Sequence, residues 1–474
     1  MANLFKIKSF RGGISDWENI GVQGAFKFGS NLSIRRDTDS LTCNQALSDD
    51  LAVGTMTAIT NFIVPASDGN TYFFNNDGKI YKRTSGGTYS LVYTDSDGAI
   101  KGAIEWGQIN GNNYLFWATD TKLHAKQTDG ASDWSDVDAD IVTTGATYTY
   151  PKTNLTSADW HTMKRINGTM LIGNKDKLAM VSYDGSYTNE ALLLVPGNSV
   201  KTLMEHSGYA YIGGTRTDYS SQAEMFVWDT AQSLNWNKKN TMPTDSINSF
   251  VNAEFPLVQV GTDGQIVLAD INSYTQPITR FSGGGQVAPD GTEVDNGVAL
   301  FGVYGNGTGK TGVYSYGRKK KNANLVLNLE HQFDCTEIGS IKKVGSDLLI
   351  SYKDTAGTGY GIKIVDTTSK ATGTYQSIDL MLPTATREPV ISRARIVTAP
   401  MPSGTSIEMY RRTDKTGNFI IANTEGGSTS FSTENGTEAW FLLGDTGKVA
   451  ELQLILNSSD NNAPEVYQIE LYFE

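Results

Sequence analysis

The stretch GNTYFFNNDGKIYKRT, residues 69–84, holds two short apolar segments separated by an Asn-Asp-Gly turn. Asp-Gly supplies the positive φ that a tight hairpin turn requires, so the two segments are predicted to pair as antiparallel strands. Both segments are apolar enough to be covered on both faces, which a single sheet of two to four strands cannot achieve alone. Small sheets stacked face to face around a common axis would provide that cover.

The same pattern of strand, turn and strand occurs seven times between residues 55 and 382. The occurrences begin at Gly69, Gly111, Gly168, Gly208, Phe255, Gly297 and Ser346. Their starts are about 40 to 57 residues apart, close to the length of a four-stranded propeller blade. We therefore predict an all-β fold with a β-propeller of about seven blades over residues 55–384. A parallel β-helix is the main alternative, but its rungs would need a tighter repeat.

A second β domain is predicted after the propeller. Four Pro residues between positions 380 and 404 mark a boundary, because Pro lacks the donor that a central strand requires. Beyond them, two segments alternate apolar and polar residues with the period of a strand. The apolar positions are Ala450, Leu452, Leu454 and Leu456 in the first segment, and Tyr467, Ile469, Leu471 and Phe473 in the second. Residues 385–474 are predicted to form a β-sandwich.

Residues 1–54 form an N-terminal arm in this interpretation. Its segment FRGGISDWENIGVQGAFKFGSNLSIRRD, residues 10–37, has no helical or strand period that continues for long. The arm could supply the strand that closes the propeller, or clasp the ring from outside with its Phe side chains between blades. Alternatively, it could dock on another subunit. The candidate interface residues are Phe10, Trp17, Phe26, Phe28, Arg35 and Arg36.

Charge and composition disfavour two classes of partner. The 474 residues carry a net charge of -12, with a pI near 5.0, so the summed field repels phosphate backbones and anionic lipid. No stretch is long and apolar enough for a signal sequence or a membrane span, which predicts assembly in a cytoplasm without a membrane segment. The two cysteines, Cys43 and Cys335, are far apart and are predicted to be buried small hydrophobic residues.

Motifs for phosphate or metal binding are incomplete. GNGTGKTG, residues 305–312, resembles a P-loop but is one residue short and precedes a strand, so a hairpin tip is predicted. The carboxylates of residues 136–140 alternate as in calcium loops, but Ile141 and Thr147 stand where Gly and Glu are needed. The four His residues show no metal-ligand spacing and are predicted to be packing or surface residues. They are His124, His161, His206 and His331. No cofactor and no catalytic residue is predicted.

One basic run and several Trp residues are candidates for contacts. The run comprises Arg318, Lys319, Lys320 and Lys321, and it could guard a sheet edge or contact an acidic partner or nucleic acid. Five Trp residues could line a sugar groove, although propeller aromatics more often fill the cores between blades. They are Trp106, Trp117, Trp134, Trp160 and Trp236.

The combination of the N-terminal segment, the divergent propeller and the terminal NNAPEVYQIELYFE resembles virion structural proteins of tailed bacteriophages. The podovirus tail nozzle, a propeller with added β domains, is similar in architecture, although no clear tube-forming insertion is present here. The resemblance implies a non-enzymatic tail component that assembles in the bacterial cytoplasm as a homo-oligomeric ring with other tail proteins. A tail protein that binds a host surface glycan is the alternative, and a glycan-degrading enzyme is a second alternative.

Overall fold

The computed structural model describes residues 3–15, 23–35, 39–129, 133–143, 145–218, 222–231, 236–269, 277–318, 321–382 and 388–474. All regular elements in these ranges are β-strands, which confirms the predicted all-β class. Within the same ranges there is no helix long and apolar enough to cross a membrane.

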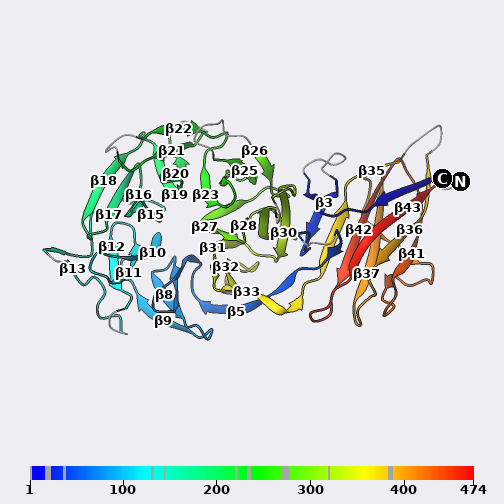
Figure 1. The fold of residues 1–474 in the computed structure, drawn as a ribbon, viewed down its shortest axis with the longest axis horizontal. Coiled ribbons are helices and arrows are strands. Elements are labelled where there is room, and N and C mark those ends of the chain that lie inside the picture. The colour runs from blue at the N-terminus through cyan, green and yellow to red at the C-terminus, as the bar shows by residue number, and fades with distance from the viewer. Residues whose placement is uncertain are drawn as a thin grey trace.

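Residues 45–370, which we call the ring, form small antiparallel sheets that follow one another around a common axis (Figure 1). The first sheet comprises β6 (Thr60–Pro65), β7 (Thr71–Asn75), β8 (Lys79–Arg83) and β9 (Tyr89–Thr94). The second comprises β10 (Gly102–Gly107), β11 (Asn113–Ala118) and β12 (Leu123–Gln127). The third comprises β15 (Met163–Ile166), β16 (Thr169–Asn174), β17 (Lys177–Ser182) and β18 (Tyr187–Leu193). A short hairpin of β13 (Ile141–Thr143) and β14 (Ala146–Tyr148) lies between the second and third sheets in the chain.

The remaining sheets of the ring continue this order. The fourth comprises β19 (Asn198–His206), β20 (Tyr209–Arg216), β21 (Glu224–Trp228) and β22 (Lys238–Thr241), and the fifth β23 (Ile247–Asn252), β24 (Pro256–Val260), β25 (Gln265–Leu268) and β26 (Pro277–Arg280). The next comprises β27 (Gln286–Asp295), β28 (Val298–Tyr304), β29 (Gly312–Gly317) and β30 (Val326–Gln332). The last comprises β31 (Glu337–Val344), β32 (Asp347–Lys353), β33 (Tyr360–Lys370) and β5 (Gln45–Met56).

The first strand of each sheet faces the axis and contacts its counterpart in the next sheet. Contacts run from β6 to β10, β15, β19, β23, β27 and β31 in turn, and β31 contacts β6 again. This closed succession of inner strands is the arrangement of a β-propeller, as the repeat predicted.

Glycines in the second strands allow neighbouring sheets to approach closely. A Cβ on Gly213 of β20 would lie 2.4 Å from Ile247 Cγ2 in the next sheet, and one on Gly302 of β28 would lie 2.6 Å from Ile338 Cγ2. The backbone of these glycines is not left-handed, so the space and not the φ angle requires Gly here.

The N-terminal segment completes the ring. Strand β5 pairs antiparallel with β33 and forms the outer strand of the sheet that contains β31, which in turn contacts β6. Of the roles that the sequence left open for this segment, the structure shows the contribution of a strand to the ring.

A second unit, the C-terminal module, adds two sheets beside the ring (Figure 1). One sheet has the order β1 (Asn3–Ile7), β43 (Glu465–Phe473), β36 (Val390–Thr398), β41 (Glu438–Thr446) and β39 (Asn423–Thr424), with β4 (Leu41–Thr42) on β43. The other runs through β3 (Ala25–Ser30), β34 (Gly373–Ser377), β42 (Val449–Asn457), β37 (Ser406–Thr413) and β38 (Ile420–Ile421), with β2 (Gly13–Ile14), β35 (Leu380–Met381) and β40 (Ser430–Phe431) alongside. The module therefore includes N-terminal strands and β34 in addition to residues from 388 onward.

The two units are joined by pairing and by a shared core. Strand β3 pairs with β30 of the ring at Ser30 and Leu329, and with β34 of the module on its other side. One continuous apolar cluster includes Phe281 and Phe301 of the ring as well as Leu452 of the module. The ring and the module are thus packed against each other and are not connected only by a linker.

Candidate functional site

Two predicted interface residues of the N-terminal segment, Phe10 and Phe26, lie inside the protein. Phe10 and Phe26 have no exposed surface, and the ring centroid of each lies 5.6 Å from that of Tyr375. Phe28 is half-buried against the same core. These side chains hold the C-terminal module together and do not insert between blades. Phe10 and Phe26 are therefore not accessible to another subunit.

Arg35 is also an internal residue. Its guanidinium forms an ion pair with Glu330, donates to the carbonyl of Val326 at 2.7 Å and donates to Ser315 Oγ at 2.5 Å. Burial lowers the pKa of Arg35, and the Glu330 carboxylate opposes that shift. Arg35 thereby fastens the N-terminal segment to β29 and β30 of the ring.

The basic run begins with an ion pair. Arg318 donates from Nε to Glu254 at 2.8 Å, and this hydrogen bond lowers the pKa of Glu254. The pair links the end of β29 to the turn between β23 and β24. Lys321 is exposed. The predicted contact residues outside the described ranges are Trp17, Arg36, Lys319 and Lys320.

The Trp residues of the ring fill spaces between sheets. Trp117 is buried, with Trp134 and Trp160 beside it, in a core shared by β6–β9 and β10–β12. Trp106 is buried in the next core, and Trp236 packs partly buried against a third. This is the packing role that propeller aromatics were expected to have.

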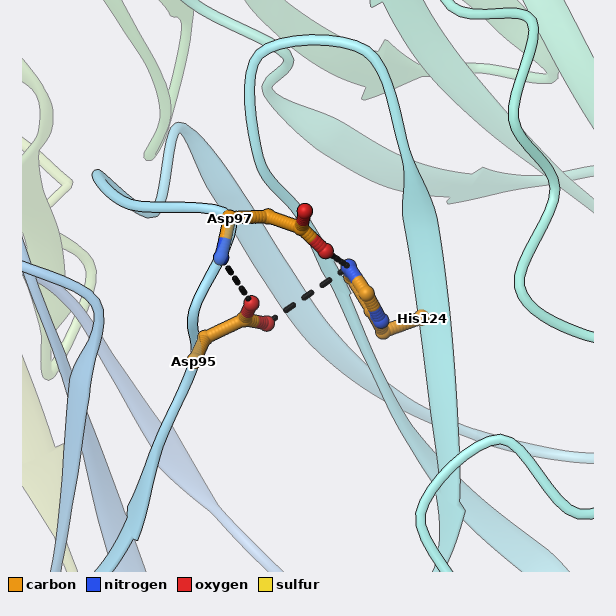
Figure 2. Close-up of side chains that lie close together, drawn as sticks. All are labelled: Asp95, Asp97 and His124. Atoms are coloured by element: carbon orange, nitrogen blue, oxygen red, sulfur yellow. Dashed lines mark hydrogen bonds and ion pairs between the residues drawn. The ribbon is translucent and has the colours of Figure 1, made fainter.

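Asp95, Asp97 and His124 come together where two neighbouring sheets of the ring meet (Figure 2). The two aspartates lie in the turn after β9, and His124 lies in β12. Asp95 folds this turn because its Oδ1 accepts the backbone N–H of Asp97 at 2.8 Å. The Oδ2 atoms of both carboxylates lie 3.5 Å from His124 Nε2. The cluster is largely enclosed, since His124 is 3% exposed and Asp95 4%.

Trp117 supports this cluster from within the core. Its indole stacks on the His124 ring with centroids 5.3 Å apart and planes 12° apart. Its Nε1–H donates to Asp95 Oδ2 at 2.7 Å, which fixes the orientation of that buried carboxylate. The imidazole is thus held in one plane, facing the turn that carries the aspartates.

Two further charged residues border the cluster. Asp138 Oδ2 lies 2.8 Å from His124 Nδ1, and Lys122 Nζ lies 2.7 Å from Asp97 Oδ1. The hydrogen bond to Asp97 raises the pKa of Lys122. Carboxylates and an imidazole at this separation are ligands that divalent metal ions accept.

Sequence reasoning missed the two aspartates and did not connect them with His124, which is buried and stacks on Trp117 as a packing residue does. The other three His residues have the expected packing or surface hydrogen bonds, to backbone carbonyls in His161 and His331 and to Asn252 in His206. The available signal was the pair of acidic residues in Asp95-Ser96-Asp97-Gly98, which directly follows β9. His124 could not be joined to it because the two segments lie in different sheets.

A cavity of about 340 Å³ lies at the axis of the ring, bounded by the inner strands. Its charges are mixed: Lys342 Nζ lies 3.2 Å from Glu293, and Asp290 accepts a hydrogen bond from Ser340 Oγ at 2.5 Å. Burial raises the pKa of Asp290, whereas burial and the charge of Lys342 lower the pKa of Lys164. The cavity is therefore polar, and the positive and negative side chains that line it compensate one another.

The outer face of the β1–β43–β36–β41 sheet carries an aromatic pair. The rings of Trp440 and Tyr472 have centroids 5.2 Å apart, and the Arg393 guanidinium lies 4.3 Å from the Trp440 centroid. Arg395 Nη1 lies 3.4 Å from Glu470, whose side chain is buried between its neighbours. Such a face presents flat apolar surface beside hydrogen-bond donors.

Comparisons with known proteins do not identify a family. No family model and no curated protein sequence matches the chain. Among solved structures, a streptogramin B lyase is similar over 68% of this chain and 98% of its own, with 10% identity and a TM-score of 0.48. The WD40 β-propeller domain of Doa1 is similar over 69% of this chain and 98% of its own, with 12% identity and a TM-score of 0.47. The extracellular domain of a hybrid two component system from B. thetaiotaomicron is similar over 95% of this chain and 63% of its own length, with 11% identity and a TM-score of 0.49.

Proposed function

We propose that the protein is a non-enzymatic structural component of a tailed-phage virion, an oligomeric protein of the tail nozzle, hub or tip. In this proposal it is built from a seven-bladed propeller and a β-sandwich. The seven inner strands that contact one another in order support the blade count. The two sheets of the C-terminal module, which enclose a common core, support the sandwich.

One observation carries the proposal: the N-terminal segment is built into both units. Strand β5 completes the ring, while β1, β3 and β4 belong to the sheets of the module. Domains joined by a linker move relative to each other by default, whereas these two units share strands and a core. A part that must hold its shape under mechanical load in a tail needs such rigidity.

The test uses the purified full chain and purified phage particles. We expect the purified protein to form a discrete oligomer in mass photometry, with rings visible by negative-stain electron microscopy. Antibodies raised against it should label the tail of phage particles and not their heads. A chain that stays monomeric and is absent from purified particles would overturn the proposal.

The aromatic face of the C-terminal module favours one second candidate, binding of a host surface glycan. Sugar rings stack on flat aromatic side chains, and Arg393 beside Trp440 could donate to hydroxyl groups. We expect Trp440→Ala to abolish any signal of the protein on a glycan array. Tyr183→Ala, an exposed aromatic of the ring, is the matched control and should leave that signal unchanged. Glycan binding that persists in Trp440→Ala would show that this face is not the glycan-binding site.

A further inference from the structure

We propose that Asp95, Asp97 and His124 bind a divalent transition-metal ion of the zinc class, which fastens the turn after β9 to strand β12. The proposal stands on the geometry of these three side chains and is independent of any role in a virion. It adds a metal cross-link between two neighbouring sheets of the ring.

The orientation of His124 is the first argument. The ring is almost completely buried, and its Nε2 has no hydrogen-bond partner among the described residues. Nε2 nevertheless points between two carboxylate oxygens, as Figure 2 shows. A buried acceptor that faces two further acceptors is unfavourable unless a cation lies between them. A metal ion at this point would satisfy Nε2, while Asp95 Oδ2 already accepts a hydrogen bond from Trp117 Nε1–H and Asp97 Oδ2 accepts one from Lys122 Nζ.

The spacing is the second argument. Metal bonds of about 2.0–2.2 Å in a tetrahedral site place neighbouring ligand atoms roughly 3.3–3.6 Å apart. The two distances from His124 Nε2 to the Asp95 and Asp97 oxygens are each 3.5 Å. Three protein ligands leave a fourth position for water. Nε2 is therefore already near the separation from both carboxylates that a bound ion would impose, and all three ligand atoms lie within 4.8 Å of one another.

The partner of the other imidazole nitrogen is the third argument. His124 Nδ1 lies 2.8 Å from the Asp138 carboxylate, so in the neutral imidazole this nitrogen is the donor and Nε2 offers its lone pair. A carboxylate that holds a histidine in this way is the usual outer partner of a metal-bound imidazole. Asp138 is thus a positioning residue for the site.

The donor set selects the class of ion. Calcium and magnesium prefer shells of oxygen atoms, whereas zinc and its neighbours accept one imidazole with carboxylates. Lys122 hydrogen-bonds to Asp97 and offsets part of the negative charge that remains around the ion. Asp95 retains its hydrogen bond from Trp117 and is presented in a fixed orientation.

The experiment measures metal binding to the full chain. The protein is treated with a chelator, dialysed and titrated with Zn²⁺ by calorimetry, and Co²⁺ is added separately to record its visible absorption. We expect one equivalent of Zn²⁺ to bind, a rise in the midpoint of thermal unfolding, and Co²⁺ bands typical of tetrahedral coordination. Absence of stoichiometric binding would overturn the proposal.

Variants distinguish this site from adventitious binding. Asp97→Asn should fold, because Asp97 lies in a turn and is partly exposed, and it should weaken Zn²⁺ binding about 100-fold. Asp138→Asn should weaken it by about 10- to 100-fold through the imidazole. His206→Ala is the matched control, since His206 lies elsewhere in the ring and bonds to Asn252. Binding that is unchanged in Asp97→Asn, or lost in His206→Ala, would contradict the assignment.

Discussion

At the scale of single residues, Glu451 on β42 is a buried carboxylate that holds two cations in the C-terminal module. It is fully buried and accepts hydrogen bonds from Arg412 Nε at 2.6 Å and from Lys27 Nζ at 3.0 Å. Burial alone would raise the pKa of Glu451. The hydrogen bonds and charges of Arg412 and Lys27 outweigh that effect, so the pKa lies below its ordinary value.

We expect Glu451→Gln to lower the free energy of unfolding by about 3 kcal/mol at pH 7, because two cations then lose their buried partner. Since the pKa of this group is lower in the folded state, its contribution is complete above the unfolded pKa of about 4.3 and is lost as pH falls through the folded pKa. Denaturant unfolding at several pH values should therefore show the difference from the parent protein narrowing below about pH 4. Glu425→Gln, at an exposed pair with Arg393, is the control and should cost less than about 1 kcal/mol.

Arg35 gives a second expectation at this scale. Arg35→Lys keeps the positive charge but loses the planar set of donors that reaches Glu330, Ser315 and the Val326 carbonyl together. We expect this change to lower the midpoint of thermal unfolding almost as much as Arg35→Ala does. Full retention of stability in the Lys variant would show that charge alone is what this position requires.

At the scale of elements, the spacing between neighbouring sheets depends on small residues in the second strands. In Gly213→Ala, the new methyl group would lie 2.4 Å from Ile247 Cγ2, so the sheets must move apart. We expect a loss of about 1–3 kcal/mol in the free energy of unfolding. Gly86→Ala is the control, because its nearest neighbour would be 3.8 Å away. If the clash is the cause, combining Gly213→Ala with Ile247→Ala should cost less than the sum of the two single changes.

Local elements could be predicted from the sequence because their causes are local. The quoted hairpin forms β7 and β8, with Gly78 at a φ of 82° in its turn. Alternation also placed Leu452, Leu454 and Leu456 in the core. The prediction for Tyr467 was wrong: it is 43% exposed, because the register with β36 shifts and passes from Gln468 to Val466.

The positions of the N-terminal strands could not be predicted, because their partners lie more than 300 residues away. Strand β5 pairs with β33, β3 with β34 and β1 with β43. Period and composition do not specify which distant edge a strand joins. For the same reason, the candidate metal ligands were not grouped, since two strands, β10 and β11, lie between Asp97 and His124 in the chain.

At the scale of the whole molecule, the shared core predicts that the ring and the module unfold together. Hydrogen exchange followed by mass spectrometry at increasing denaturant should show peptides of β6–β33 and of β36–β43 losing protection at the same concentration. The physical reason is that removing either unit exposes the apolar cluster that both contribute to. Loss of protection in the module at a clearly lower concentration would show that the two units are independently stable.

The pairing of β1 with β43 also has a consequence for biosynthesis. Strand β1 stays unpaired until β43 has been synthesised much later in the chain, and β5 likewise waits for β33. Contacts of such long sequence separation form slowly. The nascent polypeptide therefore carries unpaired strand edges until these distant partners have been made, which makes this protein a natural client for chaperones of the cell that produces it.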